Sequence, residues 1–506
     1  MSVSSSASRS LARAPASEDV EEDESRARGE TLTEDRRAAA SWRRQSDAVH
    51  RVVHFATTMP NTITHKIMLE RGWREVAPED SNWDLFYADV GWIHENIHYK
   101  TGARLADHQR VNHFPNHAEL TRKDLMAKNL NRAKRQAAKE GGAEAAKRYD
   151  ILPQTFVMPQ EALMMKRAFR DRGGLWIMKP IGRAQGRGIF VVSKLSQITA
   201  WLAEREKNGA ENICCDNYVA QRYIANPYCV GGRKFDIRLY VLVLSFRPLR
   251  AYLYREGFAR FTSVRYTRDK ASLNDHMVHL TNHSVQKRDA RYDAEKCDLR
   301  WNVRSLRQYI ASKHGTATSD ALIVNITELI LRSLRSVVPV MINDRHCFEL
   351  YGYDVMLDED LRPWLIEVNA SPSMSVDSAG DRALKTALFQ DVLNVVDMER
   401  RFHRQGVREM KKRVGGFDLI HDVVEDNLSS LGAPIARGRE NRVCLKPFLL
   451  LVRFILQDGF PVGVQRPRVT VDVHGNVELL KRRNAPRILF HHTVLHRSTE
   501  IFLQNG

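Results

Sequence analysis

The chain has 506 residues, of which 43% are hydrophobic, and its formal net charge is +17 at pH 7. A chain of this length and composition can bury a sizeable core and is expected to form roughly two to four domains, which excludes a peptide or an unfolded tail. The positive charge predicts an acidic counterpart, which composition leaves open among nucleic acid, anionic lipid and an acidic protein segment.

The cysteines and the apolar runs indicate whether the protein binds zinc or crosses a membrane. The six cysteines form no CxxC pair and have no metal-ligand spacing, which is typical of reduced thiols in an intracellular protein. The most apolar run, residues 448–452, is ended by Arg453 and is far too short for a membrane span. We therefore expect neither a zinc site nor a membrane partner.

The N-terminal third predicts a tail, a small α/β unit and a helix. Residues 1–48 are polar and low in aromatic residues, so we expect a disordered tail. The runs Arg51–Phe55 and Trp83–Val90 are typical of strands. Thr121–Arg148 predicts a helix capped by Thr121, whose basic surface is either a solvated face or a dock for an acidic partner.

From Ile151 to about Val414 strands and helices alternate, and the first chemical motif lies at MKPIGRAQGRGI, residues 178–189. Its glycines allow backbone amides to approach an anion, and Lys179 and Arg183 add positive charge. The run lacks the GK[ST] ending of a Walker motif and does not match GxGxxG. A phosphate-binding loop and a glycine-rich hairpin both stay open.

The second motif is GGRKFDIRLY, residues 231–240, followed by the apolar run 241–244. Strand side chains alternate, so Lys234, Asp236 and Arg238 share one face and the apolar residues between them share the other. The apolar continuation indicates an interior strand, although a solvated edge strand is the plainer alternative. A charged row beside a buried core predicts a site.

The third motif is a hairpin over residues 351–369 with its turn at 358–363. Its register places Asp354 opposite Glu367, with Cβ atoms roughly 5 Å apart, and Asn369 on the same face. Two carboxylates at that separation repel each other unless one binds a proton or a cation lies between them. Oxygen ligands of this kind suit Mg²⁺ bridging the phosphates of a nucleotide, so the three motifs together predict ATP binding and phosphoryl transfer.

The motifs MKPIGRAQGRGI, YVAQRYIANP, GGRKFDIRLYVLV, HLTNHSVQK and YGYDVMLDEDLRPWLIEVNASPS, in this order, resemble the tubulin tyrosine ligase-like family. The resemblance covers roughly Arg51 to Val414. NASPS with the downstream Asp381–Lys385 is most similar to the glutamate-adding branch, and KKRVGGFDLI at 411–420 is similar to the subgroup of cilia and flagella.

The resemblance implies an α/β (α+β) fold, with an ATP-grasp catalytic core and a smaller N-terminal α/β unit. The expected divisions are a disordered tail, an N-terminal domain with the basic helix, a central ATP-grasp domain, a C-terminal ATP-grasp domain with the magnesium site, and a basic extension. Their bounds are 1–48, 49–150, 151–245, 246–415 and 416–506.

The resemblance also implies roles for individual residues. Lys179, Gln185 and Gly186 would cover the ATP phosphates, Lys234 and Asp236 would contact the nucleotide, and Thr281 and Asn282 would add polar contacts near the phosphates. The adenine hinge would be Gln221, Arg222, Tyr223 and Ile224. Mg²⁺ would be held by Asp354, Glu367 and Asn369. Arg238 would stabilise an acyl phosphate, Arg260 would bind the α-carboxylate of the incoming amino acid, and Lys385 would bind the side-chain carboxylate of glutamate.

The family chemistry is ligation: ATP phosphorylates a carboxylate in a tubulin C-terminal tail, and free L-glutamate attacks the acyl phosphate. The implied partners are tubulin tails and microtubules, with accessory complex subunits as an open addition, in the cytoskeleton and the axoneme or basal body of a cilium or flagellum. Glutamate-rich tails also supply an acidic partner for the charge of +17.

Three alternatives differ in class. A glycine ligase on the same scaffold would leave Lys385 without a carboxylate to pair with. A non-catalytic microtubule-binding scaffold would have no need for all three magnesium ligands. A nucleic-acid-binding protein would carry the basic and aromatic motifs of the usual modules, and none was found, so no nucleic acid partner is expected.

Overall fold

The computed structural model describes residues 52–97, 105–183, 185–207, 217–287, 299–399, 411–422, 468–471 and 477–480. The predicted tail, residues 1–48, and the apolar run 448–452 lie outside the described residues. The chain divides into two compact units, residues 1–425 and 426–506. In the second unit, β18 (Arg468–Val471) and β19 (Val477–Leu480) pair as an antiparallel hairpin.

The first unit begins with a parallel four-stranded sheet in the order β2-β1-β3-β4. Helix α2 begins where the Thr62 side chain accepts a hydrogen bond from the backbone of His65, and α3 begins after Asp89, which caps it in the same way. The small α/β unit predicted from the aromatic runs is confirmed. Its elements are β1 (His54–Thr57), α2 (Ile63–Glu70), β2 (Arg74–Glu75), β3 (Leu85–Tyr87), α3 (Val90–Asn96) and β4 (Arg110–Val111).

The predicted basic helix is present as α4 (Ala118–Thr121) and α5 (Lys123–Lys147). The prediction that Thr121 caps it is wrong. Thr121 is the last residue of α4, and its hydroxyl donates to the carbonyl of His117, so Arg122 takes the cap position without a capping side chain. Non-helical backbone at Gly141 and Gly142 kinks α5, as expected of two consecutive glycines.

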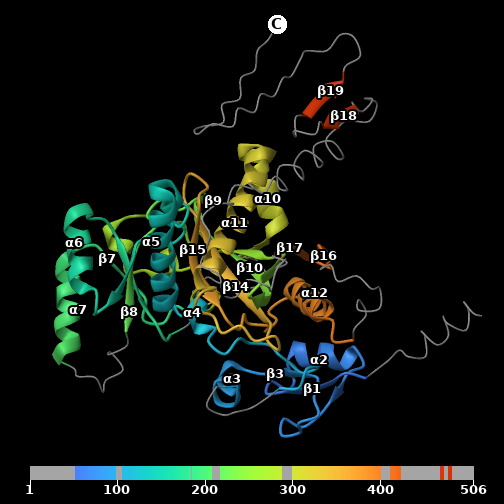
Figure 1. The fold of residues 1–506 in the computed structure, drawn as a ribbon. Helices are drawn as coiled ribbons and strands as arrows, with labels where there is room; N and C mark the ends of the chain where they lie inside the picture. Colours follow the sequence, from blue (N-terminus) through green and yellow to red (C-terminus); the bar gives the residue numbers. More distant parts are fainter. Residues whose placement is uncertain are drawn as a thin grey trace, which may run out of the picture. The chain divides into compact units, whose positions relative to one another are not determined.

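A second sheet, of four antiparallel strands in the order β5-β8-β6-β7, carries two helices side by side on one face (Figure 1). Trp176, Met178 and Ala220 of the sheet pack with Met165 and Ile198 of the helices. The elements are β5 (Thr155–Met158), α6 (Ala162–Arg172), β6 (Trp176–Pro180), β7 (Phe190–Val192), α7 (Leu195–Lys207) and β8 (Tyr218–Arg222).

The largest sheet surrounds β10 (Arg233–Phe246), which pairs with four other strands. The alternative that residues 231–240 form a solvated edge strand is therefore wrong. The other strands are β9 (Cys229–Val230), β11 (Leu249–Tyr254), β12 (Phe258–Phe261), β13 (Arg300–Asn302), β14 (Glu349–Leu357), β15 (Pro363–Asn369), β16 (Arg413–Val414) and β17 (Phe417–Asp422). Between them lie a 3-10 turn (Lys270–Ser272), α8 (His276–His279) and α9 (His283–Gln286).

The two faces of β10 belong to different cores. Phe235, Ile237 and Leu239 pack into one core with α10 (Val303–His314) and α11 (Thr316–Val337). Tyr240 and Leu242 pack into the other core with α2 and α12 (Ala379–Val396). The predicted alternation is confirmed, and it places Lys234, Asp236 and Arg238 on the same face as Tyr240.

The mixed α/β architecture predicted for the chain is confirmed. Strand β17 pairs with β11, so residues 417–422, which the sequence assigned to the C-terminal extension, belong to the largest sheet. In the part of the chain that the structure describes, no helix combines the length and the apolar character needed to cross a membrane.

Candidate active site

A cavity, here called the lysine cavity after Lys123, Lys179 and Lys234, lies where β6, β8, β10 and the β14–β15 hairpin meet. It brings together most of the residues that the sequence predicted. Those that line it are Lys179, Gln185, Gly186, Gln221, Arg222, Tyr223, Ile224, Lys234, Asp236, Thr281, Asn282, Asp354 and Glu367. Arg238, Arg260, Asn369 and Lys385 do not line it.

Two buried lysines in this cavity have neutral hydrogen-bond partners. Lys179 donates to the side-chain oxygen of Gln221 at 2.7 Å, and Lys234 donates to the Tyr223 hydroxyl and the His279 carbonyl, both at 2.9 Å. Burial lowers the pKa of Lys179 to about 8 and that of Lys234 to about 7, with the repulsion between the two ammonium groups contributing at Lys234. An anion placed between them would stabilise both charged forms.

His279 is a cavity residue within the motif HLTNHSVQK for which the sequence predicted no role. Its Nε2 lies 3.0 Å from the Ser272 carbonyl, which can only accept, so Nε2 carries the hydrogen. Burial lowers the pKa of His279 to about 4, so the ring is neutral at pH 7 and its Nδ1 accepts a hydrogen bond.

The Tyr223 hydroxyl, 2.8 Å from this Nδ1, is therefore the donor. Its own oxygen is left to accept from Lys234. A directed chain of hydrogen bonds thus runs from Lys234 through Tyr223 and His279 to Ser272, and it joins the predicted hinge to Lys234, a predicted nucleotide contact.

The glycine-rich loop after β6 closes one side of the cavity. Gln185, Gly186 and Gly188 all have positive φ angles, of 63°, 75° and 73°. A Cβ on Gly186 would lie 2.9 Å from a methyl group of Val285, so only glycine allows the loop to pack this closely against α9. The Ser284 hydroxyl also donates to the Gln185 carbonyl at 3.3 Å.

The predicted pairing of Asp354 with Glu367 is confirmed by the register of β14 and β15. A bulge follows at once, since Val355 pairs with Leu365. The bulge, which the sequence did not predict, leaves Ile366 as the extra residue.

Arginines surround the Asp354 carboxylate. Arg238 donates two hydrogen bonds to it, of 2.5 and 3.0 Å. Arg260 lies 2.8 Å from its Oδ2 atom and also donates to Asp236. These two guanidinium groups hold the pKa of the buried Asp354 well below its usual range. Lys123 lies 3.3 Å from Glu367.

The sequence predicted that the carboxylate pair needs a proton or a bound cation, but side chains of the protein already balance part of its negative charge. Arg238, Arg260 and Lys123 already supply positive charge to the pair. Asn369 lies outside the cavity wall, opposite Gly352, to whose carbonyl its amide donates at 3.2 Å. No group of three His, Cys, Asp or Glu side chains with metal-binding geometry occurs among the described residues.

Lys385 lies apart from the lysine cavity, on α12. It donates to Asp381 at 2.8 Å and to the Ser375 carbonyl, and it is only 4% exposed. The Lys385 ammonium group is thus paired with a carboxylate of the same helix. Ser375 belongs to the segment that follows Asn369, which connects Lys385 to the predicted magnesium ligands through the chain.

The donor set of the lysine cavity fits a nucleoside triphosphate with Mg²⁺. Two buried ammonium groups with neutral partners suit phosphate oxygens, and the side chains of Asp354 and Glu367 are the hard oxygen ligands that Mg²⁺ prefers. The positive φ angles of the loop allow its backbone N–H groups to face an anion. The arrangement is suited to phosphoryl transfer.

Comparison with known proteins agrees with this chemistry. Residues 101–403 match the model of the tubulin-tyrosine ligase family. A protein of Rattus norvegicus named probable tubulin polyglutamylase TTLL9 is 44% identical, over 73% of this chain and 84% of its own length. The probable alpha-tubulin polyglutamylase Ttll1 of Tetrahymena thermophila is 40% identical, over 70% and 89% of the two chains.

A third relative is less similar and much longer than this chain. The tubulin polyglutamylase TTLL5 of Mus musculus is 33% identical over 66% of this chain, which matches 24% of that longer protein. Because the family model spans more than half of the sequence and covers the strands that build the lysine cavity, the chain belongs to the tubulin-tyrosine ligase family.

Proposed function

We propose that this protein is an ATP-dependent tubulin polyglutamylase, a ligase that joins L-glutamate to glutamate side chains of tubulin C-terminal tails by forming C–N bonds. The observation that carries the proposal is the lysine cavity, where two buried lysines face the Asp354–Glu367 pair. Relatives named as tubulin polyglutamylases match most of the chain, and they support the choice of reaction within the family.

In this proposal different residues of the cavity bind different parts of the nucleotide. Lys179, Gln185 and Gly186 cover the phosphates, Thr281 and Asn282 add polar contacts near them, Lys234 and Asp236 contact the nucleotide, and residues 221–224 frame the adenine. Asp354, Glu367 and Asn369 would hold Mg²⁺, which supplies charge neutralisation at the phosphates when bound. The hydrogen-bonded arginines fix the orientation of Asp354 toward the cavity.

Three cations are assigned to the other substrates. Arg238 stabilises the acyl phosphate formed on the acceptor carboxylate, Arg260 binds the α-carboxylate of the incoming glutamate, and Lys385 binds its side-chain carboxylate. The carboxylates of Asp236, Asp354 and Asp381 already orient these cations. The guanidinium fork suits both tasks, because it pairs with planar carboxylate and phosphate oxygens and stays charged at every relevant pH.

The net charge of +17 supports an acidic macromolecular substrate. Tubulin tails on microtubules fit this chemistry, which places the protein at the cytoskeleton. The similarity of residues 411–420 to the subgroup of cilia and flagella supports an axonemal or basal-body location.

The test is incorporation of radiolabelled glutamate into microtubules in the presence of ATP and Mg²⁺. Glu367→Gln should reduce incorporation by at least about a hundredfold, because it removes a carboxylate that would neutralise and position the metal. The matched control is Glu359→Gln, which makes the same change on an exposed position in the turn of the same hairpin.

Two results would contradict the proposal. One is full activity of Glu367→Gln. The other is wild-type protein that binds ATP but incorporates no glutamate even when cell extract supplies partners. An excess of unlabelled glycine should not reduce incorporation, which separates this reaction from glycine ligation.

A further inference from the structure

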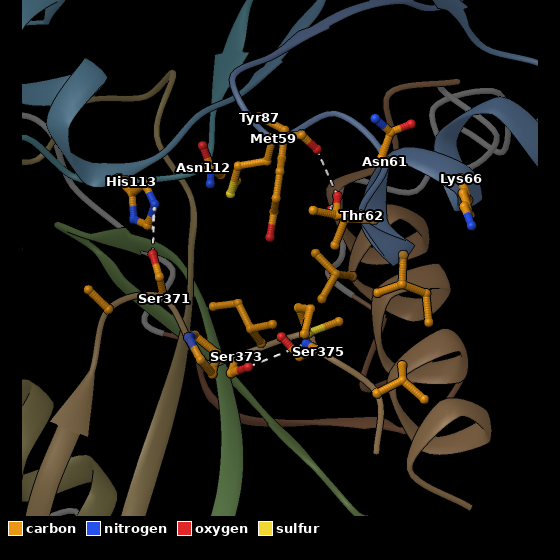
Figure 2. A pocket seen from close by; sticks show the side chains of 18 of the residues that line it. Met59, Asn61, Thr62, Lys66, Tyr87, Asn112, His113, Ser371, Ser373 and Ser375 are labelled. Atoms are coloured by element: carbon orange, nitrogen blue, oxygen red, sulfur yellow. Dashed lines mark hydrogen bonds between the residues drawn. The ribbon is translucent and has the colours of Figure 1, made fainter. Parts of the chain in front are cut away.

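A second cavity, of about 530 Å³, is lined by the start of α2, the segment that follows β15 and the first turn of α12. It is here called the serine cavity, after Ser371, Ser373 and Ser375 on the segment that follows β15. Figure 2 shows this segment on one side of the cavity, and Asn61, Thr62 and Lys66 at the start of α2 on another side. A volume of this size suits a ligand larger than a single small ion.

The charges around this cavity have one sign. Lys66 of α2 and Arg382 of α12 line it, and no Asp or Glu is among the residues of its wall. Both cations are exposed, and neither has an ion-pair partner in the part of the chain covered by the structure. Two cations from distant parts of the sequence thus meet at a wall without a carboxylate.

The remaining polar groups are mostly hydroxyl and amide side chains, which both donate and accept hydrogen bonds. Ser371 and Ser373 are exposed on their loop, and Asn61 is exposed just before the Thr62 cap of α2. The first turn of α2 contains no acidic residue. Thr62 caps this end, and with no carboxylate in the first turn the positive end of the helix dipole adds to the two side-chain cations.

The serine cavity adjoins the proposed catalytic groups. Its wall begins at Ala370, the residue after the proposed magnesium ligand Asn369. Pro372 of the wall and the side chain of Arg238 both pack against Gly352, where an added Cβ would lie 2.9 Å from Pro372 and 3.4 Å from Arg238. On the other side His113 lies 3.4 Å from the Ser371 hydroxyl.

We propose that the serine cavity binds the acidic acceptor peptide, so that a glutamate-rich segment contacts Lys66 and Arg382 while one of its carboxylates reaches Arg238. This inference rests on the proposed function. The peptide is favoured over free glutamate because a free amino acid carries an ammonium group, and no carboxylate of the wall could receive it. The nitrogen atoms of a peptide backbone are neutral amides, which the hydroxyl groups and Asn61 can satisfy.

The experiment measures binding of a fluorescein-labelled glutamate-rich peptide by fluorescence anisotropy, with its glutamine-substituted counterpart as the ligand control. Lys66→Glu and Arg382→Glu should each weaken peptide binding by about tenfold, because each converts an attraction into a repulsion. Lys128→Glu is the matched protein control. It makes the same change at an exposed position of α5 that lines neither cavity.

ATP binding, measured in parallel with a fluorescent nucleotide, should stay within about twofold of wild type in all three variants, because Lys66, Arg382 and Lys128 lie outside the lysine cavity. This readout also shows that the variants are folded. Lys66→Gln and Arg382→Gln, which only neutralise the charge, should give smaller losses in the same direction.

Three results would overturn the inference. Equal weakening by Lys128→Glu would show that the basic surface of α5 or the overall charge, and not the serine cavity, determines peptide binding. Unchanged peptide binding in both cavity variants would place the peptide elsewhere. Displacement of the peptide by free glutamate at the same site would assign the cavity to the amino acid instead. Absence of glutamate incorporation by wild-type protein that still binds the peptide would count against the proposed function alone.

Discussion

The lysine cavity and the serine cavity present positive charge in opposite ways. Lys179 and Lys234 are 7% and 3% exposed and have only neutral partners, whereas Lys66 and Arg382 are exposed to solvent. A buried cation has lost its hydration, so it gains strongly from a compact anion. An exposed cation gains less, and its attraction is screened by salt.

The difference indicates two kinds of ligand. Desolvated lysines suit a triphosphate that is enclosed on several sides, and exposed cations beside hydroxyl groups suit a flexible acidic chain that must enter and leave. The β14–β15 hairpin lines both cavities through different residues, and Arg238 of β10 pairs with Asp354 of β14 across the strands. One rigid sheet thus supports both sites.

The largest predicted effect concerns Arg238, which belongs to the sheet that both cavities adjoin. Arg238→Ala should lower the free energy of unfolding by about 3–5 kcal/mol, because it removes the bidentate partner of the buried Asp354 carboxylate. Arg382→Ala, at an exposed arginine of the serine cavity, should change it by no more than about 0.5 kcal/mol. Urea denaturation of both variants measures the contrast, and equal stabilities would remove the distinction between buried and exposed cations.

A smaller effect is expected at His279, which belongs only to the lysine cavity. His279→Gln keeps a donor for the Ser272 carbonyl but loses the ring nitrogen that accepts from Tyr223. ATP affinity should fall about fivefold to tenfold, the value of one hydrogen bond. Tyr223→Phe should cost about the same, and the double variant little more, because both changes break the same chain of hydrogen bonds.

The control for this prediction is the acidic peptide, whose affinity should not change in either variant. Fluorescent-nucleotide titration and peptide anisotropy provide the two readouts. Full additivity of the two substitutions would mean that Tyr223 and His279 act independently.

The smallest effect is a proton uptake on ATP binding. With pKa values of about 8 and about 7, Lys179 and Lys234 are partly neutral in the ligand-free protein at pH 8. Phosphate oxygens favour the charged forms, so binding should take up protons, and ATP affinity should fall as the pH rises from 7 to 9. Calorimetric titration in two buffers of different ionisation heat measures the uptake, and Lys179→Gln should reduce it.

The same lysines set the sign of a stability change in the ligand-free protein. Both pKa values are lowered in the folded state from the ordinary value of 10.5, so the unfolded chain binds more protons between about pH 7 and 10.5. Their contribution to stability therefore increases as the pH rises through this window and is lost as the pH falls through the folded pKa values. A decrease of stability over the same rise, measured on variants with and without Lys179, would contradict burial of the charge.

The features that could be predicted from the sequence are those that depend on short-range periodicity. The alternation of Lys234, Asp236 and Arg238 with apolar residues follows from the period of two in a strand, and the pairing of Asp354 with Glu367 follows from a short hairpin. The run from Lys179 to Gly188 likewise contains its own turn chemistry. These features predicted most of the lysine cavity.

The contacts between residues far apart in the sequence could not be predicted and became visible only in the folded chain. The bond between Arg238 and Asp354 joins residues 116 positions apart, and that between Tyr223 and His279 joins residues 56 positions apart. The meeting of Lys66 with Arg382 at the serine cavity depends on the packing of α2 against α12. No local pattern encodes such contacts, because they arise when separate elements bury their apolar faces in a common core.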